Sequence, residues 1–180
     1  MLILVLAVGA ASVWSIRRWR TAADNLAVVH SQSALAERFR AGMGRQVQQG
    51  LNYLDGVPES EGEFGRIEKQ LVNYLEELKA HSVDPVELDH IEGLEETKFE
   101  LQWAAENIFE KLHSPNVVTD LKAARERLVE ISDEVVDDVT ALNQYYRSRV
   151  QESVVTASDA GAFAIIVIGV SVILALIQLL

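Results

Sequence analysis

The sequence predicts an all-α protein, an antiparallel up-down-up-down four-helix bundle whose long first and last helices continue into two transmembrane helices. Apolar residues recur at three- and four-residue steps over long stretches. Uncharged apolar runs stand at both ends, and no alternating strand pattern or hairpin turn signal lies between them. The expected organisation is a transmembrane helix over residues 1–16, a helical bundle over 17–159 and a second transmembrane helix over 160–180.

The N-terminal apolar run ends at Arg17 and Arg18. Its sixteen residues reach only about 24 Å as a helix, and a bilayer core is about 30 Å thick. We therefore expect either that the helix extends to Trp19 with its arginines snorkelling, or that the native chain begins upstream. A cleaved signal peptide is the alternative, although the basic segment that begins such peptides does not precede this run.

The next three helices are delimited by capping and breaking residues. The first leaves the membrane and covers Arg17–Asp55, because Gly56 and Pro58 follow it. Ser60 and Glu63 have the form of a capping box for a second helix over Glu61–His81. Asp84 and Pro85 are a typical start for a third helix that runs to Leu112. The apolar rows expected to form the core of the second and third helices are Phe64, Ile67, Leu71, Leu75 and Leu78, and Leu88, Ile91, Leu94, Leu101, Ala105, Ile108 and Leu112.

The fourth helix starts after a break at Ser114–Asn116, and Val117–Leu180 then contains no proline. Leucine and valine recur there at seven-residue steps, which is typical of a helix-packing seam. A companion row on the same helix consists of Ala124, Ile131 and Tyr145, and Asp138 interrupts it. Residues 161–180 carry no charge and cover about 30 Å as a helix, so they predict a membrane span. The seam residues are Leu121, Leu128, Val135 and Leu142.

The helix lengths predict the architecture. The first and fourth helices outside the membrane reach about 58 and 64 Å, whereas the second and third reach only about 32 and 42 Å. The short helices therefore pair with the distal parts of the long ones, and the bundle stands on a two-helix stem.

Charge excludes one class of partner. Residues 59–110 contain 15 acidic and 4 basic residues, a net charge of 4 − 15 = −11. Phosphate contacts need clustered Lys and Arg, so nucleic acid is not an expected partner.

The positive-inside rule by itself would place Arg17, Arg18 and Arg20 in the cytoplasm, together with this acidic region.

Candidate binding residues are few. Arg38, Arg40 and Arg45 would receive an anionic ligand across a dimer interface or form a solvated basic face, and we favour the solvated face. Phe99 and Trp103 stand four residues apart and would line a small-molecule pocket or, as we favour, belong to the core.

Several polar groups also have two interpretations. Lys98 and Asp138 lie on apolar rows and either turn to solvent or specify helix register. The cluster His81, Asp84, Glu87 and His90 contains metal-ligand residue types without a recognised zinc spacing, so no metal is predicted. Capping by Asp84 and Glu87 is the favoured role, and metal or proton sensing is the alternative. No catalytic constellation or phosphate-binding loop is visible, and we expect neither a cofactor nor an enzyme activity in this region.

The order of apolar segments and helix breaks resembles the four-helix-bundle sensory regions of bacterial transmembrane receptors, which are sensor histidine kinases and methyl-accepting chemotaxis proteins. The segment ERFRAGMGRQVQQGLNYLDG, residues 37–56, is similar to the first helix of several kinase sensors. The resemblance implies an extracytoplasmic bundle in the inner membrane, a homodimer, an unknown small-molecule or protein stimulus, and cytoplasmic signalling domains downstream of Leu180. A chemotaxis receptor region, or a non-signalling membrane-anchored tether, is the alternative.

Overall fold

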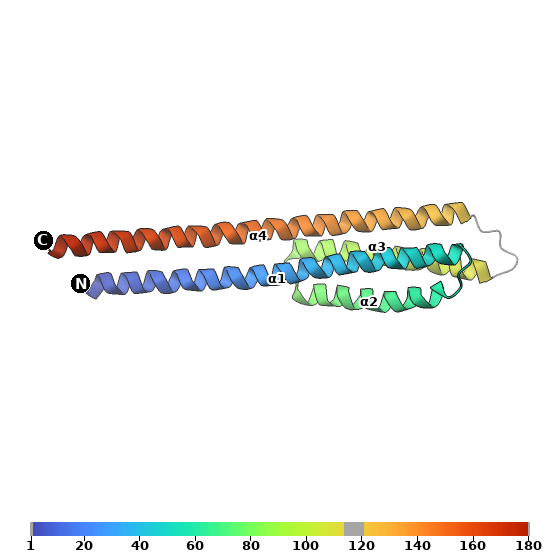
Figure 1. The fold of residues 1–180 in the computed structure, drawn as a ribbon, viewed down its shortest axis with the longest axis horizontal. Coiled ribbons are helices and arrows are strands. Elements are labelled where there is room, and N and C mark those ends of the chain that lie inside the picture. The colour runs from blue at the N-terminus through green and yellow to red at the C-terminus, as the bar shows by residue number, and fades with distance from the viewer. Residues whose placement is uncertain (1, 114–120, 180) are drawn as a thin grey trace. The chain divides into compact units, whose positions relative to one another are not determined.

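The computed structural model describes residues 2–113 and 121–179, and side chains within 8–113, 121–170 and at 172. In these ranges the chain forms four α-helices and no strand, so the predicted all-helical class is confirmed. The predicted break at Ser114–Asn116 lies outside the described residues. The helices are α1 (Leu2–Leu54), α2 (Ser60–His81), α3 (Pro85–His113) and α4 (Leu121–Leu179), coloured in chain order in Figure 1.

The predicted stop after α1 and start of α3 are confirmed. Gly56 has φ +88°, a left-handed conformation that residues with a Cβ rarely adopt, and it follows the last residue of α1 closely. At the start of α3, the backbone N–H of Val86 donates a hydrogen bond to Asp84 Oδ1 over 2.9 Å. Asp84 therefore caps the helix as the sequence indicates.

The predicted capping box at the start of α2 is wrong. Ser60 lies inside the helix and is buried, and the N-cap position belongs to Glu59, whose side chain makes no cap hydrogen bond. Glu63 accepts a hydrogen bond from Arg66 Nε over 2.8 Å instead of bonding back to the backbone. An i,i+3 ion pair on the helix surface thus occupies the carboxylate that a capping box would need.

The described chain divides into two compact units, Ser31–Tyr145 and Met1–His30 with Tyr146–Leu180. In the first unit, the whole predicted row of α2 is buried, and so are most of the predicted rows of α3 and α4. Leu112 and Leu121, at the ends of those rows, are exposed. The fully covered leucine and isoleucine side chains are Ile67, Leu71, Leu78, Ile91, Leu94, Leu101, Leu128, Ile131 and Leu142.

Side chains link the helices of this unit directly. The Phe109 ring of α3 lies 4.5 Å from the Tyr53 ring of α1 and 5.4 Å from the Phe64 ring of α2, both edge-on. Gly42 of α1 lets α2 approach, since a Cβ there would lie 2.6 Å from Leu71 Cδ2. These contacts place α1, α2 and α3 around shared core residues.

The second unit buries mostly small side chains and contains a contact between two aromatic rings. Among its described side chains, four alanines and Tyr146 are buried, and the Trp14 and Phe163 rings meet edge-on at 5.5 Å. Many larger apolar side chains of α4, such as Ile165 and Ile166, are exposed. By length and composition α4 contains a stretch apolar enough to cross a membrane, with a mean hydropathy of 1.9 and only 17% of that stretch buried. It is the one such helix among the described residues, and a membrane helix over 1–16 stays a prediction.

Candidate functional site

The basic residues of α1 remain in solvent. Arg38 and Arg45 are exposed, and Arg40 pairs with Glu37, Nη2 to Oε2, over 2.8 Å. A hydrogen bond from Arg66 lowers the pKa of Glu63, and the charge of Arg45 acts in the same direction. Arg45 thus lies close enough to the start of α2 to offset its acidic charge, which agrees with the solvated basic face favoured from the sequence.

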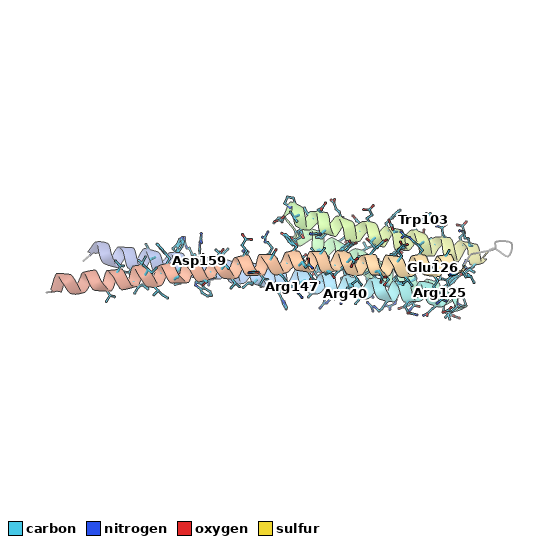
Figure 2. All side chains as sticks on the ribbon, turned by 90° about the horizontal axis from the view of Figure 1, so that it is seen from above. Arg40, Trp103, Arg125, Glu126, Arg147 and Asp159 are labelled. Atoms are coloured by element: carbon cyan, nitrogen blue, oxygen red, sulfur yellow. The ribbon has the colours of Figure 1, made fainter. Side chains whose placement is uncertain are left out.

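Phe99 and Trp103 are not core residues, which corrects the interpretation favoured from the sequence. Their exposed fractions are 66% and 64%, and Figure 2 labels Trp103 on α3. At 100° per residue both side chains lie on the side of α3 opposite the buried Leu101 and Ile108. Both residues were assigned to the core because they are aromatic. Their spacing from Leu101 and Ile108 in the sequence already places them on the opposite face of the helix.

A cavity of about 260 Å³ lies beside Trp103, between α3 and α4. Its lining includes Ile108 and Ala124, with the cations Lys111 and Arg127. Its volume is slightly below the roughly 300–1,000 Å³ of small-molecule sites. Among the five candidate binding residues, Trp103 lines this cavity, while Arg38, Arg40, Arg45 and Phe99 are not in its lining.

Lys98 and Asp138 have partners on neighbouring helices, as the register interpretation expects. Lys98 is only 9% exposed, and its Nζ lies 3.5 Å from Glu68 Oε1 of α2. The Thr97 hydroxyl of α3 donates a hydrogen bond to Asp138 Oδ2 of α4 over 2.7 Å. Because a shifted helix would leave these groups without partners in a poorly hydrated place, the two pairs favour one register of α3 against its neighbours.

Two buried glutamine side chains that join α1 to α2 were not predicted from the sequence. Gln32 Nε2 donates to Ser82 Oγ over 3.4 Å, and Gln46 Nε2 donates to the Phe64 carbonyl over 3.5 Å. Both glutamines belong to α1, are almost completely buried and contact the two ends of α2. The available signal was their position among apolar residues at helical spacing, Gln32 between Val29 and Ala36 and Gln46 between Met43 and Val47.

Arg127 of α4 joins several carboxylates. It pairs with Glu100 of α3, with Glu130 over 2.7 Å and with Glu134 over 3.5 Å. The hydrogen bond to Glu130 raises the pKa of Arg127, and the neighbouring carboxylates add to the rise. Since these side chains are about half exposed, solvent screens the attraction and the network contributes little to stability.

The cluster around the α2–α3 turn has structural partners. Asp84 caps α3, Glu87 is buried, and the His90 ring lies 6.1 Å from the Tyr145 ring. Among the side chains that the structure describes, no three His, Asp or Glu residues converge in a way that would hold a metal ion.

Comparison with protein-family models, with curated proteins and with solved structures finds no match to this chain.

Proposed function

We propose that this chain is the sensory input and transmembrane signalling region of a bacterial two-component sensor histidine kinase. The bundle lies outside the cytoplasm, and the last helix relays a stimulus to cytoplasmic output domains downstream of Leu180. The observation that carries the proposal is that α4 extends without a break from Leu121 to Leu179. One end of α4 supplies buried Leu128, Val135 and Leu142, and its other end is the apolar stretch.

Side-chain pairs between α1 and α4 support the antiparallel bundle. Ser33 Oγ donates to Asn143 Oδ1 over 2.8 Å, the Gly50 backbone approaches Leu128, and Asp55 pairs with Arg125. Residue numbers on α4 fall as those on α1 rise, so the two helices run in opposite directions. The short connections from α1 to α2 and from α2 to α3 give the same alternation.

A second copy of the chain is the expected partner of α4. Val129 and Val136 are 46% and 41% exposed and lie seven residues apart, and Val154 and Val155 are exposed as well. Apolar side chains at heptad spacing on one helix are typical of a helix–helix interface. A homodimer packed along α4 would cover them, with both chains inserted in the inner membrane as multi-pass proteins.

The topology predicts which reagents reach the bundle. A single cysteine at the exposed position Asn73 of α2 is expected to react with an impermeant maleimide in spheroplasts that retain an intact inner membrane. Residues 1–180 contain no cysteine, so labelling of this chain reports this one site. A cytoplasmic cysteine protein from the same cells controls for leakage. Labelling only after lysis would contradict an extracytoplasmic bundle.

The signalling role is tested with disulfides as a defined input. Joined to a histidine-kinase output, single cysteines placed along Tyr146–Val154 are expected to cross-link two copies with a repeat of about 3.5 residues. Cross-linking at the most reactive positions is expected to change kinase output, because it fixes the relative position of two α4 helices. Autophosphorylation before and after oxidation in membranes measures this change.

Reduction of the same samples should restore the starting output. Cross-links that form without any change in output would support a non-signalling tether. A uniform cross-linking profile along the segment would contradict a packed dimer there.

A further inference from the structure

The exposed side of α3 combines aromatic rings with uncompensated acidic charge. Phe99 and Trp103 are its two apolar side chains at the centre, and both stand about two-thirds exposed. We call this surface the α3 acid–aromatic face, and its residues are Glu92, Glu96, Phe99, Trp103, Glu106 and Glu110.

The spacing of this face is symmetrical about the aromatic pair. Glu96 lies three residues before Phe99 and Glu106 three residues after Trp103, while Glu92 and Glu110 lie seven residues away. Steps of three, four and seven residues keep all six side chains on one side of a helix. The result is an apolar centre bracketed by carboxylates over about 27 Å, or five turns.

The carboxylates of this face have no cationic partner among the described residues. Glu95, beside the face, pairs with Lys79 over 2.6 Å, and Glu106 accepts a hydrogen bond from Gln102 over 2.9 Å. Glu92, Glu96 and Glu110 make no such contact with any side chain in the described part of the chain. Three free carboxylates therefore surround two exposed rings.

We propose that the α3 acid–aromatic face binds a basic amphipathic segment of a partner protein or peptide. Apolar side chains of that segment would cover Phe99 and Trp103, and its Lys or Arg residues would meet Glu92, Glu96 and Glu110. Exposed aromatic rings make favourable contacts with apolar side chains and also with cations, because the electron-rich face of a ring attracts a positive charge.

The charges also argue against a second copy of this chain as the occupant. Two identical faces would bring the same carboxylates together, and like charges opposed across an interface are unfavourable. The homodimer proposed above uses α4, which leaves α3 free for another partner. The basic segment would be the stimulus, so this inference rests on the proposed sensory function. Its binding to the purified protein is measured without any kinase output. Failure of binding and failure of signalling are therefore distinguishable.

The test uses the full chain in nanodiscs of zwitterionic phosphatidylcholine. The probe is a synthetic helical peptide of about 18 residues, or five turns, with leucine on one face and lysine on the other. The same peptide with glutamate in place of lysine is the charge control, and empty nanodiscs give the binding to lipid. We expect the lysine peptide alone to bind the protein above the lipid background, with an affinity that falls as salt rises.

Matched variants locate the binding surface. Phe99→Ser with Trp103→Ser, and separately Glu92→Gln with Glu96→Gln and Glu110→Gln, are each expected to weaken binding by about tenfold or more, as hot-spot residues do. Val83→Ser with Val86→Ser removes exposed apolar side chains elsewhere and should leave the affinity unchanged. Glu76→Gln with Asp133→Asn and Asp137→Asn removes three exposed carboxylates elsewhere and should weaken binding far less.

Trp103 supplies a direct report of contact. The chain contains three tryptophans, so in a W14F/W19F background its own tryptophan fluorescence comes from Trp103 alone once the emission of empty nanodiscs is subtracted. We expect its emission to shift to shorter wavelength as the lysine peptide covers the ring. Unchanged affinity in the Phe99→Ser/Trp103→Ser variant, or equal loss in both triple-carboxylate variants, would overturn the proposal. Loss of the homodimer in the aromatic variant would instead identify this face as a contact between copies.

Discussion

Leu101→Ala is expected to destabilise the Ser31–Tyr145 unit by about 2–5 kcal/mol, the usual range for truncating a buried leucine to alanine. Leu101 is completely buried on α3, so its loss leaves a cavity among side chains that cannot fully close around it. Phe99→Ala, two residues earlier on the same helix, removes a larger side chain that is 66% exposed. It is expected to change the free energy of unfolding by less than about 0.5 kcal/mol, as surface substitutions usually do.

Thermal unfolding of the full chain in detergent, followed by circular dichroism, measures both changes. A loss of 1 kcal/mol lowers the midpoint by roughly 2–4 °C in a chain of this size, so the two variants separate clearly. Phe99→Ala is the matched control, because it shares the helix and the alanine replacement. Equal midpoints for the two variants, or a lower midpoint for Phe99→Ala, would contradict the burial pattern of α3.

This pair of residues also shows where sequence reasoning about the fold succeeds and where it fails. The periodic rows of α2, α3 and α4 predicted most of the buried residues, because a helix repeat of 3.6 residues converts spacing directly into a face. Phe99 and Trp103 were assigned to the core from their chemistry, against the face on which their spacing places them. A candidate interaction surface was therefore visible in the sequence as aromatic residues on a charged face.

Partners across helices could not be predicted from the sequence. Lys98 and Asp138 stood out as charges on apolar rows, but Glu68 and Thr97 became their partners only through the packing of α2, α3 and α4. The predicted capping box at the start of α2 is wrong for a local reason. Glu63 has two competing partners, the backbone and Arg66, and it bonds to Arg66. Such choices depend on small energy differences that residue patterns do not resolve.

Inserting Gly-Gly after Ser153 is expected to abolish transmission along α4 while leaving the Ser31–Tyr145 unit folded. Two glycines lower helix propensity by about 2 kcal/mol relative to alanine, which creates a flexible point between the bundle and the apolar stretch. The input is a disulfide between two copies at a cysteine-substituted position N-terminal to the insertion, such as the exposed Arg147 (Figure 2). The readout is autophosphorylation of a kinase output joined after Leu180.

Couplings between sites are typically about 1–3 kcal/mol, so in the uninterrupted chain the disulfide is expected to change kinase output by about 5- to 150-fold. In the Gly-Gly variant the same disulfide should leave output unchanged. Ala-Ala at the same point is the matched control, because it inserts the same length and rotates the following residues equally but keeps the helix stiff. It is expected to alter the resting output and retain a response to the disulfide. Replacing the exposed Gln151 and Glu152 by glycine adds flexibility without changing register, and should also weaken the response. A Gly-Gly variant that responds as fully as the uninterrupted chain, at equal expression in the membrane, would show that a stiff α4 is not what carries the signal.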